Sequence, residues 1–367
     1  MTPELLRTPL FRLHLDLGGR MVPFAGYEMP VQYPSGILAE HLFTRTSASL
    51  FDVSHMGQVV IRGDRRVAAL EALVPGDIEA LGEGRIRYTQ FTNDQGGIKD
   101  DLMVTNAGDH LFLVINAACK DADIAHLRAH LGGGADLVLL TDRALLALQG
   151  PKAADALARF APGVAELSFM TAGTFDVGGI VCLISRSGYT GEDGFELSVP
   201  ADRAEELARR LLAEPEIRPA GLGARDSLRL EAGLCLYGSD IDETTSPVEA
   251  ALTWSISKRR RAGGGFPGAA VVQEQLATGV GRRLVGIRPL GKAPARAHTA
   301  IVDDGGVEIG VVTSGGFGPS VGGPVAMGYV PDPLSRPGSA VGLLIRGVRH
   351  DAEVVALPFV PHRYHKV

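Results

Sequence analysis

The spacing of apolar residues predicts one strand–helix series that occurs twice. The first copy comprises a strand, a helix, three strands and a second helix at residues 57–63, 64–73, 85–92, 98–105, 110–116 and 121–131. The second copy repeats this order at residues 144–150, 151–160, 173–178, 180–186, 194–199 and 201–214. The two openings also align at one constant spacing, with Gly63 and Pro75 matching Gly150 and Pro162. The pattern therefore indicates two copies of one α+β unit.

A different pattern begins at about residue 282, where short strands alternate with Gly- and Pro-rich turns. This pattern is typical of a small antiparallel β-barrel or sandwich. We expect a first region over 1–270, with lobes at about 51–134 and at about 1–50 plus 135–270, and a separate domain over 280–367. The basic run 258–261, which precedes several glycines, is interpreted as a solvated linker.

Two adjacent carboxylates, Asp100 and Asp101, lie in the predicted strand over 98–105. The stretch 93–97 before it is rich in residues that reverse a chain, so a hairpin is expected. Alternation places Asp100 on an aliphatic face, where it can cap turn N–H groups, and Asp101 on a mixed face that can line a cavity. The next strand, over 110–116, is apolar on both faces, so the sheet should be covered on both sides. Acids beside turns are common, so both a structural and a functional role for Asp101 stay open at this point.

A third carboxylate and two arginines have a similar setting. Like Asp101, Glu196 lies in a strand that follows a Gly-rich turn, and Glu196 stands there between Phe195 and Leu197. Arg225 and Arg229 lie one helical turn apart in a leucine-rich segment, so part of this helix is buried, and a buried arginine needs a carboxylate.

Histidines give weaker signals. His126 and His130 are spaced as neighbours on a helix, but no third ligand is close in sequence, so an exposed helix face is expected rather than a metal site. His55 is expected to be a structural histidine with satisfied hydrogen bonds.

Composition limits the class of protein. With 45% hydrophobic and 21% charged residues, the 367-residue chain is globular and large enough for two or three packed units. A net charge of −6 argues against a nucleic-acid partner, and three scattered cysteines argue against a disulfide framework or a zinc knuckle. No apolar run approaches the roughly 20 residues of a membrane span, and the N-terminus lacks the pattern of a signal peptide. The expected location is cytoplasmic, without a membrane or metal partner.

Nine stretches spread almost from end to end form long and specific motifs. They are TPL at 8–10, FAGYEMPVQY at 24–33, RTSASLFDVSHMG at 45–57, NDQGGIKDD at 93–101, LQGPKA at 148–153, GYTGEDGFE at 188–196, GLGARDSLRLEAGLCLYG at 221–238, VTSGGFGPS at 312–320 and PFVPHRY at 358–364. Together they resemble the aminomethyltransferase family, the T-protein of the glycine cleavage system.

The resemblance implies a fold and a reaction. The fold is α+β: two related α/β lobes bind tetrahydrofolate centrally, and an antiparallel β-barrel follows at the C-terminus. The implied partner is lipoylated H-protein, whose dihydrolipoyl sulfur carries an aminomethyl group. Its one-carbon unit passes to tetrahydrofolate, giving 5,10-methylenetetrahydrofolate and ammonia. A carboxylate in a dry site would activate the folate nitrogen and stabilise a cationic iminium-like carbon, and no protein nucleophile is needed.

The resemblance also assigns residues by position. Asp101 matches the family's catalytic aspartate. Glu196 and Arg225 match folate-binding positions, and Tyr364 matches a C-terminal tyrosine that closes over the ligand. Further folate-lining positions fall on Tyr88, Asn116 and Tyr189.

Proteins of the same fold leave alternatives. Another tetrahydrofolate-dependent demethylase is one, and a folate-binding iron–sulfur assembly factor without transfer activity is the other. The flavin domain that precedes the related lobes of sarcosine and dimethylglycine dehydrogenases is missing from this sequence. Asp101 and the GARDSLRLEAG stretch favour the aminomethyltransferase.

Overall fold

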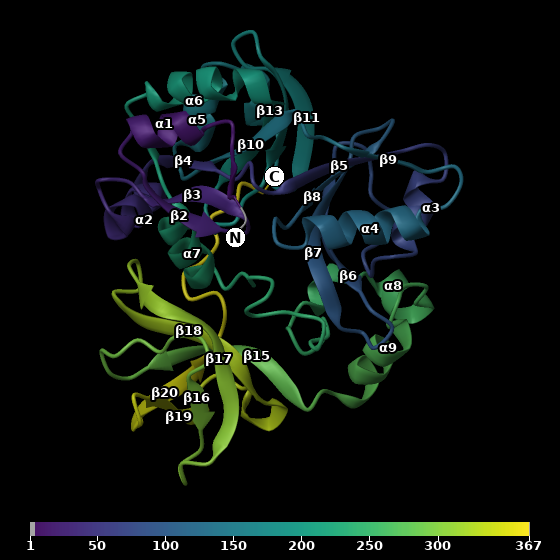
Figure 1. The fold of residues 1–367 in the computed structure, drawn as a ribbon. Coiled ribbons are helices and arrows are strands. Elements are labelled where there is room, and N and C mark those ends of the chain that lie inside the picture. The colour runs from purple at the N-terminus through teal and green to yellow at the C-terminus, as the bar shows by residue number, and fades with distance from the viewer. Residues whose placement is uncertain (1–3, 367) are drawn as a thin grey trace.

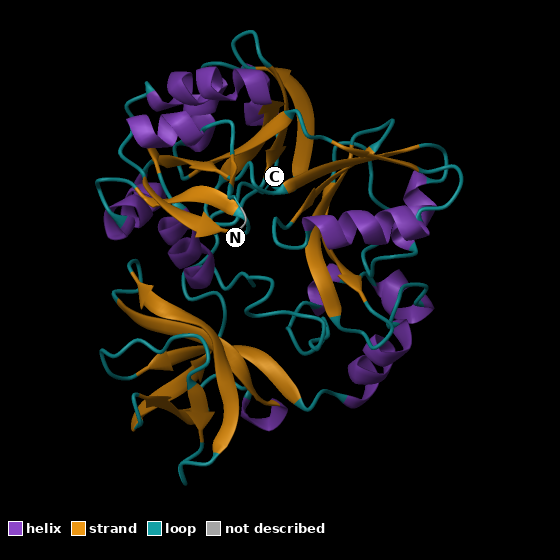
Figure 2. Ribbon diagram, in the orientation of Figure 1, coloured by secondary structure: helices purple, strands orange, loops and turns teal. Residues whose placement is uncertain are grey.

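The computed structural model describes residues 4–366, which form three units around a common centre (Figure 1). Two units combine sheets with helices, and the third consists mainly of strands (Figure 2). The two ends of the described part of the chain lie near this centre. Over residues 4–366, no helix has the length and apolarity that crossing a membrane requires.

The first unit is a five-stranded sheet in the order β6-β7-β8-β5-β9. Its elements are β5 (Gly57–Arg62), α3 (Arg66–Glu71), β6 (Ile86–Thr92), β7 (Ile98–Asn106), β8 (Leu111–Ile115), α4 (Lys120–His130) and β9 (Asp136–Leu139). The hairpin between β6 and β7 forms because Asn93 Oδ1 accepts the N–H groups of Gln95 and Gly97 at 3.0 and 2.8 Å. Gly97 fits there because a Cβ would lie 1.8 Å from the Glu243 carbonyl oxygen.

The second unit is a six-stranded sheet in the order β11-β12-β13-β10-β4-β14. Its strands are β4 (Ala48–Asp52), β10 (Arg143–Gln149), β11 (Thr171–Asp176), β12 (Val181–Arg186), β13 (Gly194–Pro200) and β14 (Ile217–Pro219). Its helical segments are α1 (Phe11–Asp16), α2 (Ile37–Thr46), α5 (Ala153–Ala158), η1 (Pro162–Glu166), η2 (Ala201–Arg203), α6 (Ala204–Leu212) and α7 (Leu222–Glu231). A small N-terminal sheet in the order β1-β3-β2 joins this unit through β1 (Leu6–Arg7), β2 (Arg20–Phe24) and β3 (Tyr27–Gln32).

The two sheets share one strand order, as the repeated pattern predicted. Strands β6-β7-β8-β5 correspond to β11-β12-β13-β10, and β4 is inserted before the last strand of the second sheet. An apolar cluster contains residues from both sheets, including Val60 and Val114 of one and Phe51 and Leu145 of the other. The other face of β8 packs into a separate core with α3 and α4. The expectation that this sheet is covered on both sides is therefore confirmed.

The basic run 258–261 is not a solvated linker, so that interpretation was wrong. It lies in α8 (Lys258–Gly263), between η3 (Thr253–Ser255) and α9 (Ala269–Thr278). Arg259 pairs with Glu71 at 2.7 Å, and the buried Arg260 donates to the Val74 carbonyl at 2.8 Å. These arginines anchor the connecting helices to the first unit because its acids and free carbonyls face them.

The third unit is a closed antiparallel barrel in the order β15-β18-β17-β16-β19-β20. Its elements are β15 (Arg282–Pro289), β16 (Ala300–Val302), β17 (Glu308–Gly318), β18 (Gly323–Pro331), η4 (Asp332–Leu334), β19 (Ala340–Ile345) and β20 (Val348–Val355). Closure leaves no free sheet edge around a core of valine, isoleucine and leucine. The α+β class with a C-terminal barrel is thereby confirmed, while the exact domain boundaries remain predictions.

Candidate active site between the two sheets

Asp100 and Asp101 lie near the start of β7 and point to opposite faces of its sheet. Burial alternates along the strand, so that Asp100 is fully buried and Asp101 is partly exposed, as predicted. Asp101 lies opposite Gln90 on β6 and therefore shares a face with Gln90 and Tyr88.

Asn116, directly after β8, joins the two aspartates. Its Nδ2 donates to Asp101 Oδ1 at 2.7 Å and to Asp100 Oδ1 at 2.9 Å. Its backbone N–H donates to Asp100 Oδ2 at 3.1 Å. The expectation that Asp100 caps the hairpin turn was wrong, because Asn93 already holds those amides. Asp100 instead organises the end of the neighbouring strand.

The environment of Asp101 favours proton exchange near neutral pH. Burial raises the pKa of Asp101 to about 7, the charge of Asp100 adds to this effect, and hydrogen bonds from Tyr88 and Asn116 oppose it. Nowhere in residues 4–366 does a lysine or arginine form an ion pair with Asp101. The Tyr88 ring stacks on Trp254, with centroids 5.2 Å apart, and Trp254 is 63% exposed. Tyr88, which shares a sheet face with Asp101, is therefore stacked on a ring that reaches solvent.

Glu196 lies on the second sheet, on β13 opposite Ser185 of β12. It lines a cavity of about 20 Å³ together with Ser185, Ser187 and Ser198. Burial raises the pKa of Glu196, while the Arg225 charge and the Ser187 hydroxyl oppose that rise. A partly desolvated carboxylate can accept hydrogen bonds from a ligand.

Arg225, on α7, faces Glu196 and Tyr189. Its guanidinium lies 4.8 Å from the centroid of the Tyr189 ring, and its buried Nη1 has no hydrogen-bond partner within the described chain. The next arginine on this helix, Arg229, is buried and pairs with Asp240 at 2.7 Å. The expected carboxylate partner is therefore confirmed for Arg229, whereas Arg225 keeps a donor free.

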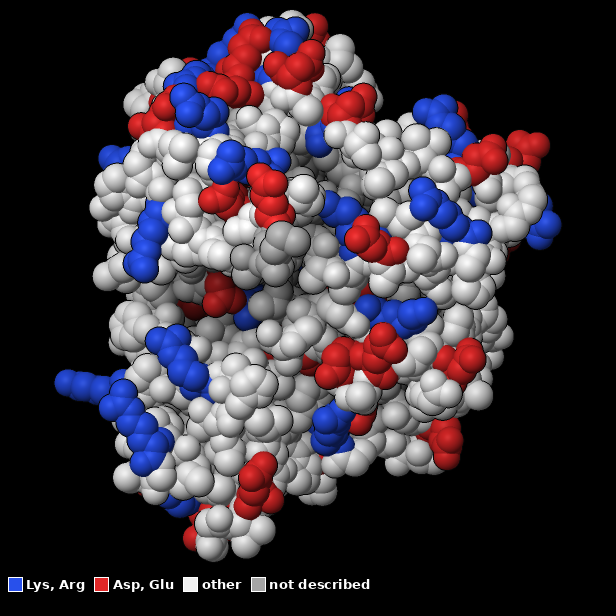
Figure 3. Space-filling model, viewed as in Figure 1, with Lys and Arg blue, Asp and Glu red and all other residues white. Residues whose placement is uncertain are grey.

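The two groups of residues face a shared space. Burial raises the pKa of Tyr189, the charge of Arg229 lowers it, and the charge of Asp101 raises it. Asp101 is therefore close enough to act electrostatically on Tyr189. The surface is hollowed where the units meet, and charged side chains lie inside the hollow (Figure 3). The charge of Asp101, on the first sheet, therefore reaches Tyr189, whose ring the Arg225 guanidinium contacts.

The C-terminal segment 358–366 is held on the protein surface. Val360 N–H donates to the Glu231 carbonyl at 3.0 Å, and Arg363 N–H donates to the Gly191 carbonyl at 2.8 Å. The Tyr364 ring stacks on Phe169, with centroids 3.9 Å apart and planes 5° from parallel. Burial raises the pKa of Tyr364 to about 12. Its hydroxyl has no hydrogen-bond partner among the contacts of residues 4–366, so it can meet a ligand.

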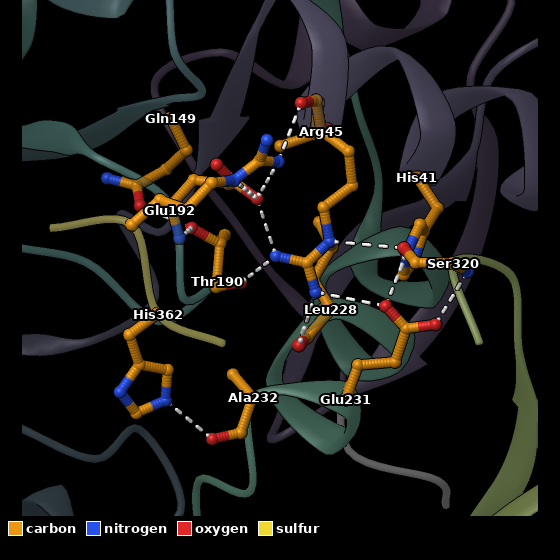
Figure 4. A network of polar contacts seen from close by, with 12 residues as sticks. His41, Arg45, Gln149, Thr190, Glu192, Leu228, Glu231, Ala232, Ser320 and His362 are labelled. Atoms are coloured by element: carbon orange, nitrogen blue, oxygen red, sulfur yellow. Dashed lines mark hydrogen bonds and ion pairs between the residues drawn. The ribbon is translucent and has the colours of Figure 1, made fainter. Parts of the chain in front are cut away.

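A buried ion network anchors this segment (Figure 4). Arg45 of α2 donates to Glu192 at 2.9 Å and to Glu231 of α7 at 3.1 Å. Glu231 also accepts the Ser320 N–H from the barrel at 2.7 Å. Arg363 donates to Glu192 and to the Arg45 carbonyl. Sequence reasoning missed this network because its members are far apart in the chain and no local pattern pairs them.

Ending the chain after Val360 should leave a folded protein with weaker folate binding and slower turnover. The cut removes Tyr364 and Arg363, whereas the barrel and both sheets keep their cores. Tyr364→Phe alone should cost about 1 kcal/mol of folate affinity, the usual worth of one neutral hydrogen bond. Calorimetry with both variants checks this. Full affinity and turnover in the truncated chain would show that the tail is passive.

The histidines differ from their expected roles. His55 is buried between Phe24 and Tyr27, its Nδ1 has no partner among the described residues, and burial lowers its pKa to about 4. The expected satisfied histidine was therefore wrong. The His126 and His130 rings lie 4.5 Å apart, and no group of three possible metal ligands occurs within residues 4–366.

The arrangement suits chemistry between two bound substrates. One wall carries a carboxyl that exchanges a proton near neutral pH, and the other carries Glu196 and a free donor of Arg225. Burial raises the pKa of the Cys119 and Cys235 thiols, so neither is an activated nucleophile. A buried carboxylate without a cation can stabilise positive charge that develops on a substrate.

Comparisons with known proteins match this geometry. Residues 10–260 match the family described as the GCVT N-terminal domain, and residues 282–361 match the glycine cleavage T-protein C-terminal barrel domain. The mitochondrial aminomethyltransferase of Gallus gallus is 51% identical over 374 residues, covering 99% of this chain and 95% of that protein. The Homo sapiens protein is 50% identical over 369 residues, covering 98% and 91%. The crystal structure of glycine cleavage system aminomethyltransferase T from Bartonella henselae is 44% identical with a TM-score of 0.94, covering 99% and 100%.

Proposed function

The chain belongs to the aminomethyltransferase (T-protein) family of the glycine cleavage system, and we propose that it uses Asp101, Glu196 and Arg225 to move a one-carbon unit from H-protein to tetrahydrofolate. The donor is an aminomethyl group on the sulfur of the dihydrolipoyl arm. The carbon–sulfur and carbon–nitrogen bonds of this group break, and two bonds form to folate nitrogens. The two protons that leave those nitrogens balance the ammonia and thiol that are released.

The observation that carries this proposal is the setting of Asp101. The carboxyl is oriented by Asn116 at 2.7 Å, shares a face of the sheet with Tyr88, and has no ion pair in the described part of the chain. It can therefore accept a hydrogen bond from a folate N–H and stabilise positive charge on the transferred carbon. Glu196 suits the paired N–H donors of a pterin ring, and the free Nη1 of Arg225 suits a ligand acceptor.

Ammonia release by the purified chain tests the function. We expect release only when tetrahydrofolate and aminomethylated H-protein are both present. A sulfonium demethylase would instead act without H-protein, and a folate-binding assembly factor would bind folate without releasing ammonia. Either of those results would contradict the proposal. The cytoplasmic location stays a prediction, since the relatives named above are mitochondrial.

The transfer rate should rise with pH through about 7. The active form of Asp101 is the ionised carboxylate, and burial raises the pKa of Asp101 to about 7, so the ionised fraction increases as pH rises through that value. Single-turnover rates between about pH 6 and pH 8 check this prediction. Asp101→Asn should give a flat, low profile over the same range. A wild-type rate that falls as pH rises would show that the protonated acid is the active form.

A further inference from the structure

A short segment after α7, residues 234–240, joins the barrel to the second unit. On the barrel side, the Tyr329 hydroxyl of β18 donates to the Asp240 carbonyl at 2.7 Å. On the other side, the hydroxyl of Tyr189, in the turn between β12 and β13, donates to the Cys235 carbonyl. The Tyr189 ring is the one that lies 4.8 Å from the Arg225 guanidinium. The segment therefore connects the barrel to the side chains around Arg225.

The Asp240 side chain is the point where the barrel holds this segment. It is buried, and its Oδ2 accepts hydrogen bonds from the Leu236 N–H at 2.9 Å and from Arg229 Nη1 at 2.7 Å. The Ser314 hydroxyl of β17 donates to the same oxygen at 2.9 Å and accepts from Arg229 Nη2 at 2.9 Å. The Thr313 hydroxyl donates to the other carboxylate oxygen. Two barrel hydroxyls and one arginine thus fix the carboxylate that holds the Leu236 N–H.

A β-bulge in β17 lets adjacent barrel residues reach the same carboxylate. Successive side chains of a regular strand point to opposite faces, so Thr313 and Ser314 could not both face Asp240. The register of β17 against β18 shifts between Val312 and Ser314, which leaves Thr313 as the extra residue. Bulges re-aim side chains and are frequent next to active sites. Apolar side chains often pack as stably as a buried ion pair, so this polar joint is better explained by the geometry that it fixes.

We propose that the barrel positions the folate site, with Asp240 and Ser314 as positioning residues. Asp240 holds the segment, and the Cys235 carbonyl of that segment holds the Tyr189 hydroxyl. With its hydroxyl fixed, the Tyr189 ring stays against Arg225, whose buried Nη1 keeps a donor free for a ligand. This inference rests on the folate-binding role proposed above for Arg225.

A double-mutant cycle tests the connection. Ser314→Ala removes a barrel hydroxyl, and Tyr189→Phe keeps the ring but removes its hydrogen bond to the segment. Asp240 is a poor target, because its removal leaves the buried charge of Arg229 unpaired, which is strongly destabilising. Ser335→Ala is the matched control, because Ser335 belongs to the same unit and donates to a carbonyl of η4 at 2.7 Å.

Calorimetry measures the tetrahydrofolate affinity of the four proteins of the cycle. We expect Ser314→Ala to weaken binding about five- to tenfold, within the range of coupling that substitutions away from a ligand produce. In the Tyr189→Phe background the same substitution should have no further effect, since the hydrogen bond to the segment is already absent. Ser335→Ala should bind as the wild type does. Unchanged affinity in Ser314→Ala, or an equal loss in both backgrounds, would overturn the proposal.

Nuclear magnetic resonance of carbon-13-labelled tyrosine rings tests the positioning without any ligand. The chain has seven tyrosines, and Tyr189→Phe identifies the Tyr189 signal by its loss. We expect this signal to shift in Ser314→Ala and to stay unchanged in Ser335→Ala. An unchanged Tyr189 signal in Ser314→Ala would overturn the inference. If the chain binds no tetrahydrofolate, the proposed function fails, whereas the tyrosine signal still decides whether the barrel holds Tyr189.

Discussion

Replacing Asp101 with asparagine should lower the single-turnover rate of methylenetetrahydrofolate formation by about 10²–10³, the usual cost of losing one electrostatic stabiliser. The amide keeps an oxygen that can accept the Asn116 hydrogen bond, so the fold and folate binding should be largely retained. Only the negative charge is removed, and with it the stabilisation of positive charge on the transferred carbon.

A matched control is available in the hairpin that precedes the strand. Asp94 is exposed at its turn, so Asp94→Asn should leave the rate and the folate affinity unchanged. Rapid-quench measurements of all three proteins at saturating folate separate chemistry from binding. A near wild-type rate in Asp101→Asn would remove Asp101 from the chemistry.

Replacing Glu196 with alanine should weaken folate affinity by about ten- to a hundredfold, because a charge-assisted hydrogen bond is worth roughly 1.5–3 kcal/mol. Burial raises the pKa of Glu196, whereas Arg225 and Ser187 both lower it and so favour the charged carboxylate that a ligand N–H would meet. Isothermal calorimetry measures the change directly. Trp254 is the only tryptophan in the chain and stacks on Tyr88, so its fluorescence gives a second readout.

Two comparisons make the result specific. Glu196→Gln keeps a hydrogen-bond acceptor without the charge, so its loss should be smaller than that of Glu196→Ala. The exposed Glu166, on the same unit, is the control, and Glu166→Ala should bind folate as the wild type does. Unchanged affinity in Glu196→Ala would leave Glu196 only as the electrostatic partner of Arg225.

Local patterns predicted the strand that carries the aspartates and the opposite orientations of Asp100 and Asp101. Both follow from two-residue alternation and from a turn rich in glycine and asparagine, which depend on neighbours in sequence. The repeated strand order also followed from local periodicity. The strand pattern did not distinguish a barrel from a sandwich. Barrel closure depends on which distant strand edges pair, a property that short strands do not encode.

Partners distant in sequence could not be predicted in this way. We expected Asp100 to accept hydrogen bonds from the turn amides. Asn93 accepts those hydrogen bonds, and Asp100 accepts hydrogen bonds from Asn116 instead. The run 258–261 was interpreted as solvated because the acids that pair with its arginines, such as Glu71, lie far away in the sequence.

The central claim is that Asp101 drives transfer of the one-carbon unit from H-protein to tetrahydrofolate. Its most direct test follows an isotope-labelled carbon, placed in the aminomethyl group of H-protein, by nuclear magnetic resonance during one turnover. With the wild-type chain, the label should leave the lipoyl sulfur and appear in 5,10-methylenetetrahydrofolate as ammonia is released. With Asp101→Asn at saturating folate, the label should remain on H-protein over the same time. Label that stays on H-protein with the wild-type chain, or that moves equally fast with the variant, would contradict the account.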